Sequence, residues 1–228
     1  MRILFILFFI ISFSFAQNIV LKKSYDVSYG IFSKLGISDA YFSANYETNT
    51  YEARISANAN GFAKVLSKNR SEIYLSKGEI KDGKFLPKIF YKQSSTNSKN
   101  REKEYFFDHI NKKVELVKTT RDKKGNRTSK EILEYYAKDD ILSLFFNLKD
   151  SLKDLEIGVE KDFIAVGNDK NKGIISLKKL DKNSLKVYLN QEIFSSKRGE
   201  LDIILDENGL SKIATLKDVL LFGDIVAK

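Results

Sequence analysis

One histidine and one pair of adjacent carboxylates are the residues of this sequence best suited to chemistry. His109 is the single histidine of the chain and follows Asp108. A histidine acts as a general base only beside an oriented nucleophile, and a His-rich metal site needs more than one. Asp139 and Asp140 could serve hydrolysis as a pair, yet acids just before a helical pattern are more typical of a cap. We therefore expect His109 to be an exposed turn residue and the aspartates to cap a helix.

Other chemical signatures are missing from the sequence. The chain contains no cysteine, which excludes disulfides, thiolate metal ligands and a lipid-modified cysteine. It has no Gly-rich phosphate-binding loop, no Gly-x-Ser-x-Gly nucleophile motif and no dinucleotide fingerprint after a strand. The sequence thus predicts no catalytic residue, no metal site and no cofactor, and a protein that is not an enzyme.

The first sixteen residues have the pattern of a secretory signal. Arg2 precedes the apolar run 3–11, and small residues stand at Ser14 and Ala16. The run is shorter than the roughly 20 residues needed to span a bilayer, so we expect cleavage after Ala16. An uncleaved N-terminal anchor is the alternative. Residues 17–228 would then form a single β-rich domain, periplasmic or secreted, with no transmembrane segment.

Charge indicates which partners are plausible. The chain has 39 Lys and Arg against 30 Asp and Glu, and the mature form keeps a net charge of +8 once Arg2 is removed. The excess is lysine dispersed along the chain rather than arginine clustered with aromatic residues, so we expect no nucleic-acid partner. Dispersed lysine on strands is typical of solvated faces, and loose attraction to anionic lipid headgroups or polysaccharide is compatible with it.

Apolar residues alternate with polar ones along most of the chain, which predicts strands. The first alternation starts at Lys22, and a break at 33–36 separates it from the next strand. Polar residues at 94–102 indicate a loop, and turns are expected at 109–112, 122–126 and 217–218. Further strands are predicted at 159–166, 174–180, 185–193, 200–205, 210–216 and 219–226.

Two helices are predicted within this strand pattern. Residues 61–69 have apolar side chains at helical spacing and form a short candidate. The stronger one carries apolar residues at i, i+3, i+4, i+7 and i+11, namely Ile141, Leu144, Phe145, Leu148 and Leu152. The fold class is therefore mainly β: an antiparallel curved sheet, as an open barrel or sandwich, with one central amphipathic helix.

The inward faces of two early strands suggest a place for an apolar ligand. Alanines alternate with larger residues on one of them, and small residues on an inward face leave room. The alternative is that the helix at 141–152 fills the space, because every half-buried sheet must cover its apolar face. If the space is partly open, the predicted ligand-binding residues are Tyr25, Tyr29, Tyr51, Ile55, Phe62, Phe145 and Phe146.

Four short motifs resemble a bacterial family, the domain of unknown function 3108. They are Tyr25 to Phe32 followed by Gly36, the segment from Gly83 to Pro87, Phe107-Asp108 before a hairpin, and Asp140 to Ser143 at the helix start. The family's helix entry is rich in proline, and this chain has none there. The resemblance implies an exported, β-rich envelope protein, and it supplies no catalytic residues.

Two functions fit these observations. The first is a non-catalytic binding or carrier module of the cell envelope, whose ligand is a lipid or another apolar molecule. The second is a structural or scaffold protein that docks another envelope protein through a sheet edge or the lysine-rich face. A hydrolase would need acids clustered inside the same cavity. An open apolar cavity within the monomer would separate the first from the second.

Overall fold

Fifteen strands join into one sheet in the part of the chain that the structure describes. The structure is a computed structural model, and it describes residues 18–29, 32–153, 155–168, 171–189, 196, 198–219 and 223–228. The predicted signal peptide at 1–16 lies outside the described residues. None of the described helices is long and apolar enough to cross a membrane.

The elements follow the chain in a simple order. Eight strands come first, with a short helix after the third: β1 (Ile19–Tyr29), β2 (Phe32–Asn45), β3 (Thr50–Ala59), α1 (Gly61–Leu66), β4 (Ser71–Lys81), β5 (Lys84–Thr96), β6 (Lys99–Asp108), β7 (Lys113–Asp122) and β8 (Gly125–Ile132). The rest are β9 (Asp139–Asp140), α2 (Ile141–Lys153), β10 (Glu160–Val166), η1 (Asn171–Gly173), β11 (Ile174–Lys179), β12 (Ser184–Tyr188), β13 (Glu200–Leu205), β14 (Ser211–Val219) and β15 (Gly223–Ala227).

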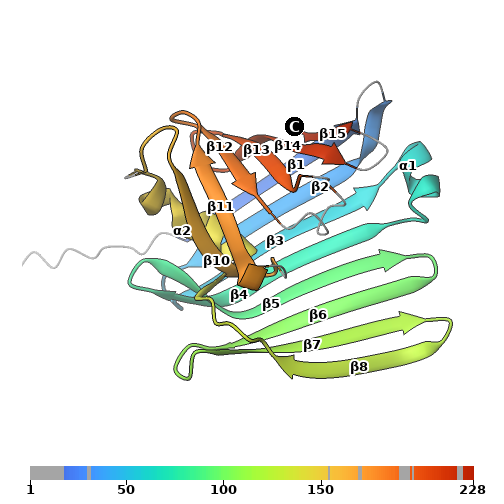
Figure 1. Cartoon of the computed structure of the whole chain (residues 1–228), viewed down its shortest axis with the longest axis horizontal. Coiled ribbons are helices and arrows are strands. Elements are labelled where there is room, and N and C mark those ends of the chain that lie inside the picture. The colour runs from blue at the N-terminus through green and yellow to red at the C-terminus, as the bar shows by residue number, and fades with distance from the viewer. Residues whose placement is uncertain are drawn as a thin grey trace, which may run out of the picture.

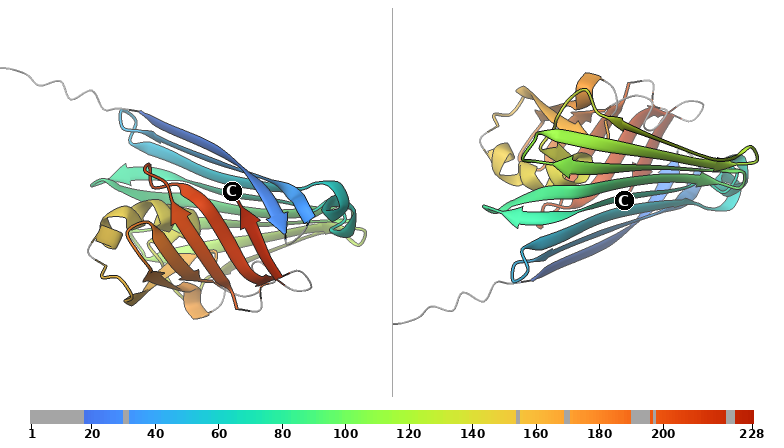
Figure 2. Two further views of the ribbon diagram at one scale, coloured as in Figure 1. Left: turned by 90° about the horizontal axis from the view of Figure 1, so that it is seen from above. Right: turned by 90° about the horizontal axis from the view of Figure 1, so that it is seen from below.

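The sheet consists of two meanders joined at one seam. Strands β1 to β8 lie in chain order, strands β10 to β15 lie in chain order, and β15 pairs antiparallel with β1. Strand β9 pairs parallel with β10, and the other pairings are antiparallel. The second meander turns back over the first, and α2 lies between them at one end (Figures 1 and 2). The prediction of a curved, mainly antiparallel sheet with one central helix is confirmed.

Helix α2 links two hydrophobic cores because it is apolar on two sides. Leu142 and Phe146 pack with buried residues of the first meander, among them Phe42 and Phe90. Leu144 and Leu148 pack with the second meander, whose core includes Leu177 and Ile203. A helix packed between two cores must be apolar over more than one stripe, and the sequence of α2 is apolar on both of the sides that are buried. The predicted helix at 141–152 is therefore confirmed, as is a short helix within 61–69.

Two predicted interruptions are strand instead. The predicted break at 33–36 lies inside β2, where Gly36 permits close packing: a Cβ there would come within 2.3 Å of the Asn58 carbonyl oxygen on β3. The predicted loop at 94–102 is the end of the β5–β6 hairpin. It is polar because that end extends past the core, and its polar side chains hydrogen-bond between the two strands, as when Gln93 Nε2 donates diagonally to Asn100 Oδ1 over 3.2 Å.

A third correction concerns the predicted turn at 217–218. Strand β14 continues through these residues to Val219, with a shift in its pairing to β15 between Leu216 and Val219. Asp218 has a φ of 49°, so the backbone is locally irregular although pairing resumes after it. A bulge and a turn favour similar residues, so the predicted turn is wrong and the segment is an irregularity within β14.

Candidate ligand cavity

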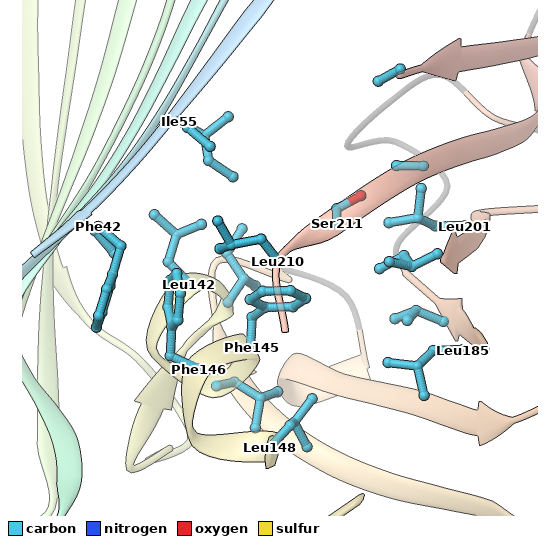
Figure 3. Close-up of a pocket in the computed structure, with 18 of the residues that line it drawn as sticks. Phe42, Ile55, Leu142, Phe145, Phe146, Leu148, Leu185, Leu201, Leu210 and Ser211 are labelled. Atoms are coloured by element: carbon cyan, nitrogen blue, oxygen red, sulfur yellow. The ribbon is translucent and has the colours of Figure 1, made fainter. Parts of the chain in front are cut away.

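A cavity of about 290 Å³ lies between the two meanders, beside α2. Figure 3 shows side chains from both meanders and from the helix pointing into the same space. The walls are almost entirely apolar. Those from the first meander and the helix include Leu21, Tyr25, Ala40, Phe42, Ala53, Ile55, Leu142, Leu144, Phe145, Phe146 and Leu148, and those from the second include Phe163, Ile175, Leu177, Leu185, Val187, Leu201, Ile203, Leu210, Ser211, Ala214 and Ala227.

Small residues create the space. Ala40 and Ala53 face it from β2 and β3, and Ala214 and Ala227 face it from β14 and β15. Ala214 and Ala227 are register partners, so no large side chain projects from either strand at that point. The volume is near the lower end of the roughly 300–1,000 Å³ range of pockets that bind small molecules.

Aromatic rings close the end of the cavity next to α2. The ring of Phe146 stacks on that of Phe42 with centroids 4.0 Å apart and planes 22° apart. Phe145 meets Phe146 edge to face at 5.3 Å, and Phe85 meets Phe42 in the same way at 5.1 Å. Offset and edge-to-face contacts of this kind are favourable beyond the area they bury. This end of the cavity is thus rigid hydrocarbon.

The opposite end carries the polar groups. The hydroxyl of Tyr25 donates to the Ser211 carbonyl oxygen over 2.7 Å, which links β1 to β14 across the cavity. Burial, together with the nearby Asp206 carboxylate, raises the pKa of Tyr25 to about 12. The Tyr25 hydroxyl therefore stays protonated and acts as a donor.

A buried polar network fixes the start of α2. Asp140 is fully buried, and its Oδ1 accepts the backbone N–H groups of Leu142 and Ser143 over 2.8 and 3.0 Å. The Asp140 N–H in turn donates to Ser143 Oγ over 2.9 Å, which completes a reciprocal cap. The predicted capping role of the acidic pair is confirmed at Asp140.

The same carboxylate is tied to the first meander. Ser76 Oγ donates to Asp140 Oδ2 over 2.6 Å, and the Tyr51 hydroxyl is 2.8 Å from Ser76 Oγ. Burial raises the pKa of Asp140 to about 6, against the opposing effect of the Ser76 and backbone hydrogen bonds. Burial also raises the pKa of Tyr51. These groups lie beneath the helix rather than in the cavity walls, so they position α2 and do not face a ligand.

Asn147 anchors the middle of α2 to strand β5. Its Oδ1 accepts the Phe85 N–H over 2.9 Å, and its Nδ2 donates to the Phe85 carbonyl oxygen over 2.9 Å and to Asp139 Oδ1 over 2.6 Å. The amide therefore pairs with a backbone residue as a neighbouring strand would. Together with the Asp140 cap, it sets how far Phe145 and Phe146 reach into the cavity.

A family model described as a protein of unknown function, DUF3108, matches residues 24–205. The chain belongs to the DUF3108 family. A crystal structure of a DUF1089 family protein from Pseudomonas aeruginosa is similar at 14% identity, with 69% of this chain and 86% of that chain covered, but its TM-score is 0.28. No curated protein matches the chain. The match covers α2, the first meander from Ser24 onward, and the second meander as far as the end of β13.

The residues predicted from the sequence of this DUF3108 chain fall into three groups. Tyr25, Ile55, Phe145 and Phe146 line the cavity. Tyr51 is buried in the adjacent core, where its hydroxyl joins the Asp140 network, and Tyr29 lies on β1 outside the lining, with its ring 3.8 Å from a Cβ built on Gly223. The Phe62 side chain lies outside the described residues.

The sequence reasoning missed the second wall and the polar end of the DUF3108 cavity. Leu185, Val187 and Leu201 alternate with polar residues, so their strands were predicted, but nothing local shows that these strands fold back onto β1–β3. Lys23 and Asp206 were also missed. They form an ion pair across 183 positions of sequence, which no local pattern reveals.

His109 is half-buried rather than exposed, although it lies in the predicted turn of this DUF3108 chain. Its Nε2 is 2.7 Å from the Pro87 carbonyl oxygen, and its Nδ1 is 2.8 Å from the Tyr136 hydroxyl. Both ring nitrogens are used to hold the 133–138 segment against β5. Among the described residues, no three His, Cys, Asp or Glu side chains converge closely enough to hold a metal ion.

Proposed function

We propose that this protein is a non-catalytic carrier or binding module of the cell envelope, exported by the signal pattern at residues 1–16, which holds one acyl chain between its two meanders. The observation that carries the proposal is the cavity of about 290 Å³ with walls of hydrocarbon. The helix α2 could have filled this space and does not, because alanines face it from four strands. Apolar pockets with few polar groups are typical sites for apolar ligands.

The size of the cavity favours one chain over two. Each methylene buried from water contributes about 0.8 kcal/mol, so lengthening a bound chain by two carbons should strengthen binding about 15-fold while the cavity still has room. Once the chain is longer than the cavity, the gain should stop. A series of saturated carboxylates from eight to sixteen carbons, measured by calorimetry, therefore reports both occupancy and length.

Native mass spectrometry with lipid extraction is the direct test. The protein should be purified from its own cell envelope, and an acyl-containing species bound at one to one is the expected result. The same protein stripped of lipid should then rebind dodecanoate. A clean apo protein that rebinds none of the carboxylates would refute the carrier proposal.

One observation favours docking to another protein as a second function. Strand β8 is the edge of the first meander, and every residue of Gly125–Ile132 is exposed. An exposed edge of eight residues offers backbone donors and acceptors to a strand from a partner. Photo-cross-linking in cells distinguishes the carrier function from docking. The cross-linker is placed at Thr128 on β8 and, as a control, at Thr48 in the β2–β3 turn. A cross-linked partner specific to Thr128, with no bound lipid, would favour docking.

A further inference from the structure

Polarity divides the cavity into two ends. Next to α2 the lining is Phe42, Phe146 and Leu148, whereas hydroxyl-bearing residues gather where β1, β2 and β14 meet. Tyr25 and Ser38 are register partners there, and Tyr25 donates across the gap to Ser211. A space with hydrocarbon at one end and hydroxyls at the other matches a molecule that has an apolar tail and a polar head.

A lysine stands at the polar end. Lys23 lies on β1 between Leu21 and Tyr25, two residues from each, so it shares the inward face of the strand with these two cavity residues. Its ammonium is 5.5 Å from the centroid of the Tyr25 ring and 2.7 Å from Asp206 Oδ2. The side chains of Lys23 and Asp206 are 27% and 21% exposed, so the ion pair is in contact with water and lies beside the cavity residue Tyr25 rather than among the lining residues.

The ion pair leaves Lys23 able to bind a second anion. An ammonium has three donors, and in the described part of the chain Asp206 accepts one of them. Asp206 does not depend on the lysine to hold its position. Its Oδ1 accepts the backbone N–H groups of Asn208 and Leu210, each over 3.0 Å, which fixes the carboxylate to its own hairpin.

Ser211 gives an independent indication of a polar ligand group. Its Oγ is buried and has no hydrogen-bond partner among the described residues. A buried hydroxyl without a partner carries a desolvation penalty that a ligand oxygen would relieve. Figure 3 shows this oxygen beside the apolar side chains that are drawn around it.

We propose that the ligand is a single-chain amphiphile with an anionic oxygen head, a carboxylate or a phosphate, whose head binds Lys23 at the Tyr25–Ser211 end while its chain extends toward α2. This inference rests on the proposed carrier function and adds the class and orientation of the ligand. A volume of about 290 Å³ suits one chain. The net charge of +8 of the mature form would also attract anions to the molecule from a distance.

The test compares heads on one chain length. Dodecanoate, dodecyl phosphate and dodecan-1-ol share twelve carbons, and inorganic phosphate supplies a head without a chain. We expect the two anionic amphiphiles to bind wild-type protein about tenfold more tightly than the alcohol, because the hydrogen bond to Lys23 is charge-assisted. Inorganic phosphate alone should bind far more weakly than dodecyl phosphate.

Two variants separate head recognition from a structural ion pair. Lys23→Met keeps the hydrocarbon stem over Tyr25 and should lose the tenfold preference while binding dodecan-1-ol unchanged. Asp206→Asn keeps the Oδ1 acceptor of the hairpin and removes the competing anion, so it should bind dodecanoate more tightly than wild type. Lys22→Met, on the opposite face of β1, is the matched control. It should change neither the preference for anionic heads nor the affinity for dodecanoate.

Each other outcome overturns a specific statement. If Lys23→Met and Asp206→Asn weaken dodecanoate binding alike, the ion pair is structural and the head assignment is wrong. If the alcohol binds wild type as well as the carboxylate, the head assignment fails while the carrier function stands. If no twelve-carbon probe binds, the carrier function itself fails. Should Lys23→Met not fold, Asp206→Asn decides alone, since tighter dodecanoate binding supports the assignment and weaker binding overturns it.

Discussion

Replacing Ala214 by leucine would place three more carbon atoms inside the cavity, because Ala214 faces it from the middle of β14. If an acyl chain occupies that space, the new side chain displaces about three of its methylenes. At about 0.8 kcal/mol each, the loss is about 2.4 kcal/mol, or about 50-fold in the dissociation constant. The side chain enters empty space, so the free energy of unfolding of the apo protein should change by less than about 1 kcal/mol.

Calorimetric titration with dodecanoate measures the first quantity and urea unfolding the second. Thr215→Leu is the matched control. Thr215 is the next residue on β14 and points to the opposite face, so a larger side chain there cannot reach the cavity. The reasoning would be refuted by an Ala214→Leu protein that folds normally and binds dodecanoate as tightly as wild type, because the chain would then lie elsewhere.

Three further predictions concern stability, each measured by urea unfolding. Burial raises the pKa of Asp140 from 3.8 to about 6, so its protonation stabilises the fold fully below pH 4, and this stabilisation is lost as the pH rises through 6. Asp140→Asn keeps the cap acceptor and should reduce the change in the free energy of unfolding between pH 4 and 7 by about 3 kcal/mol. An unchanged dependence of stability on pH would contradict this. Asn147→Ala leaves the Phe85 backbone groups unpaired and should cost about 3 kcal/mol, whereas a cost below about 1 kcal/mol would show that water replaces the amide. Gly78→Ala puts a Cβ 1.9 Å from the Leu86 carbonyl oxygen at the β4–β5 bulge and should cost more than about 2 kcal/mol; a neutral result would mean that the bulge is adaptable.

Local patterns in the sequence were sufficient for most elements but not for their arrangement. Alternation predicts a strand because one face of it is buried, and the spacing from Ile141 to Leu152 predicts a helix for the same reason. Asp140 could be predicted as a cap because capping needs only residues within one turn. The 94–102 hairpin was missed because its strands have no buried face, and polar cross-strand pairs such as Gln93 and Asn100 look like a loop.

Only the part of the candidate site that comes from the first strands and the helix could be predicted from the sequence. Tyr25 and Ile55 stand on early strands whose inward face is visible in the sequence, and Phe145 stands on the helix that must cover it. The opposite wall and the Lys23–Asp206 pair depend on the second meander returning to the first strand. Pairing between segments so far apart is specified by the whole sheet, not by any one segment.

The seam between β1 and β15 bears on how the cavity forms in time. Its register pairs are Val27 with Ala227, Ser28 with Val226 and Tyr29 with Ile225, so the two strands that complete the wall are separated by nearly the whole described chain. Closing so long a loop is costly in entropy, and contacts of this kind are slow to form. Each meander can assemble from neighbouring strands beforehand. The cavity should therefore arise in the last folding step, and the short seam is the place where it would first reopen.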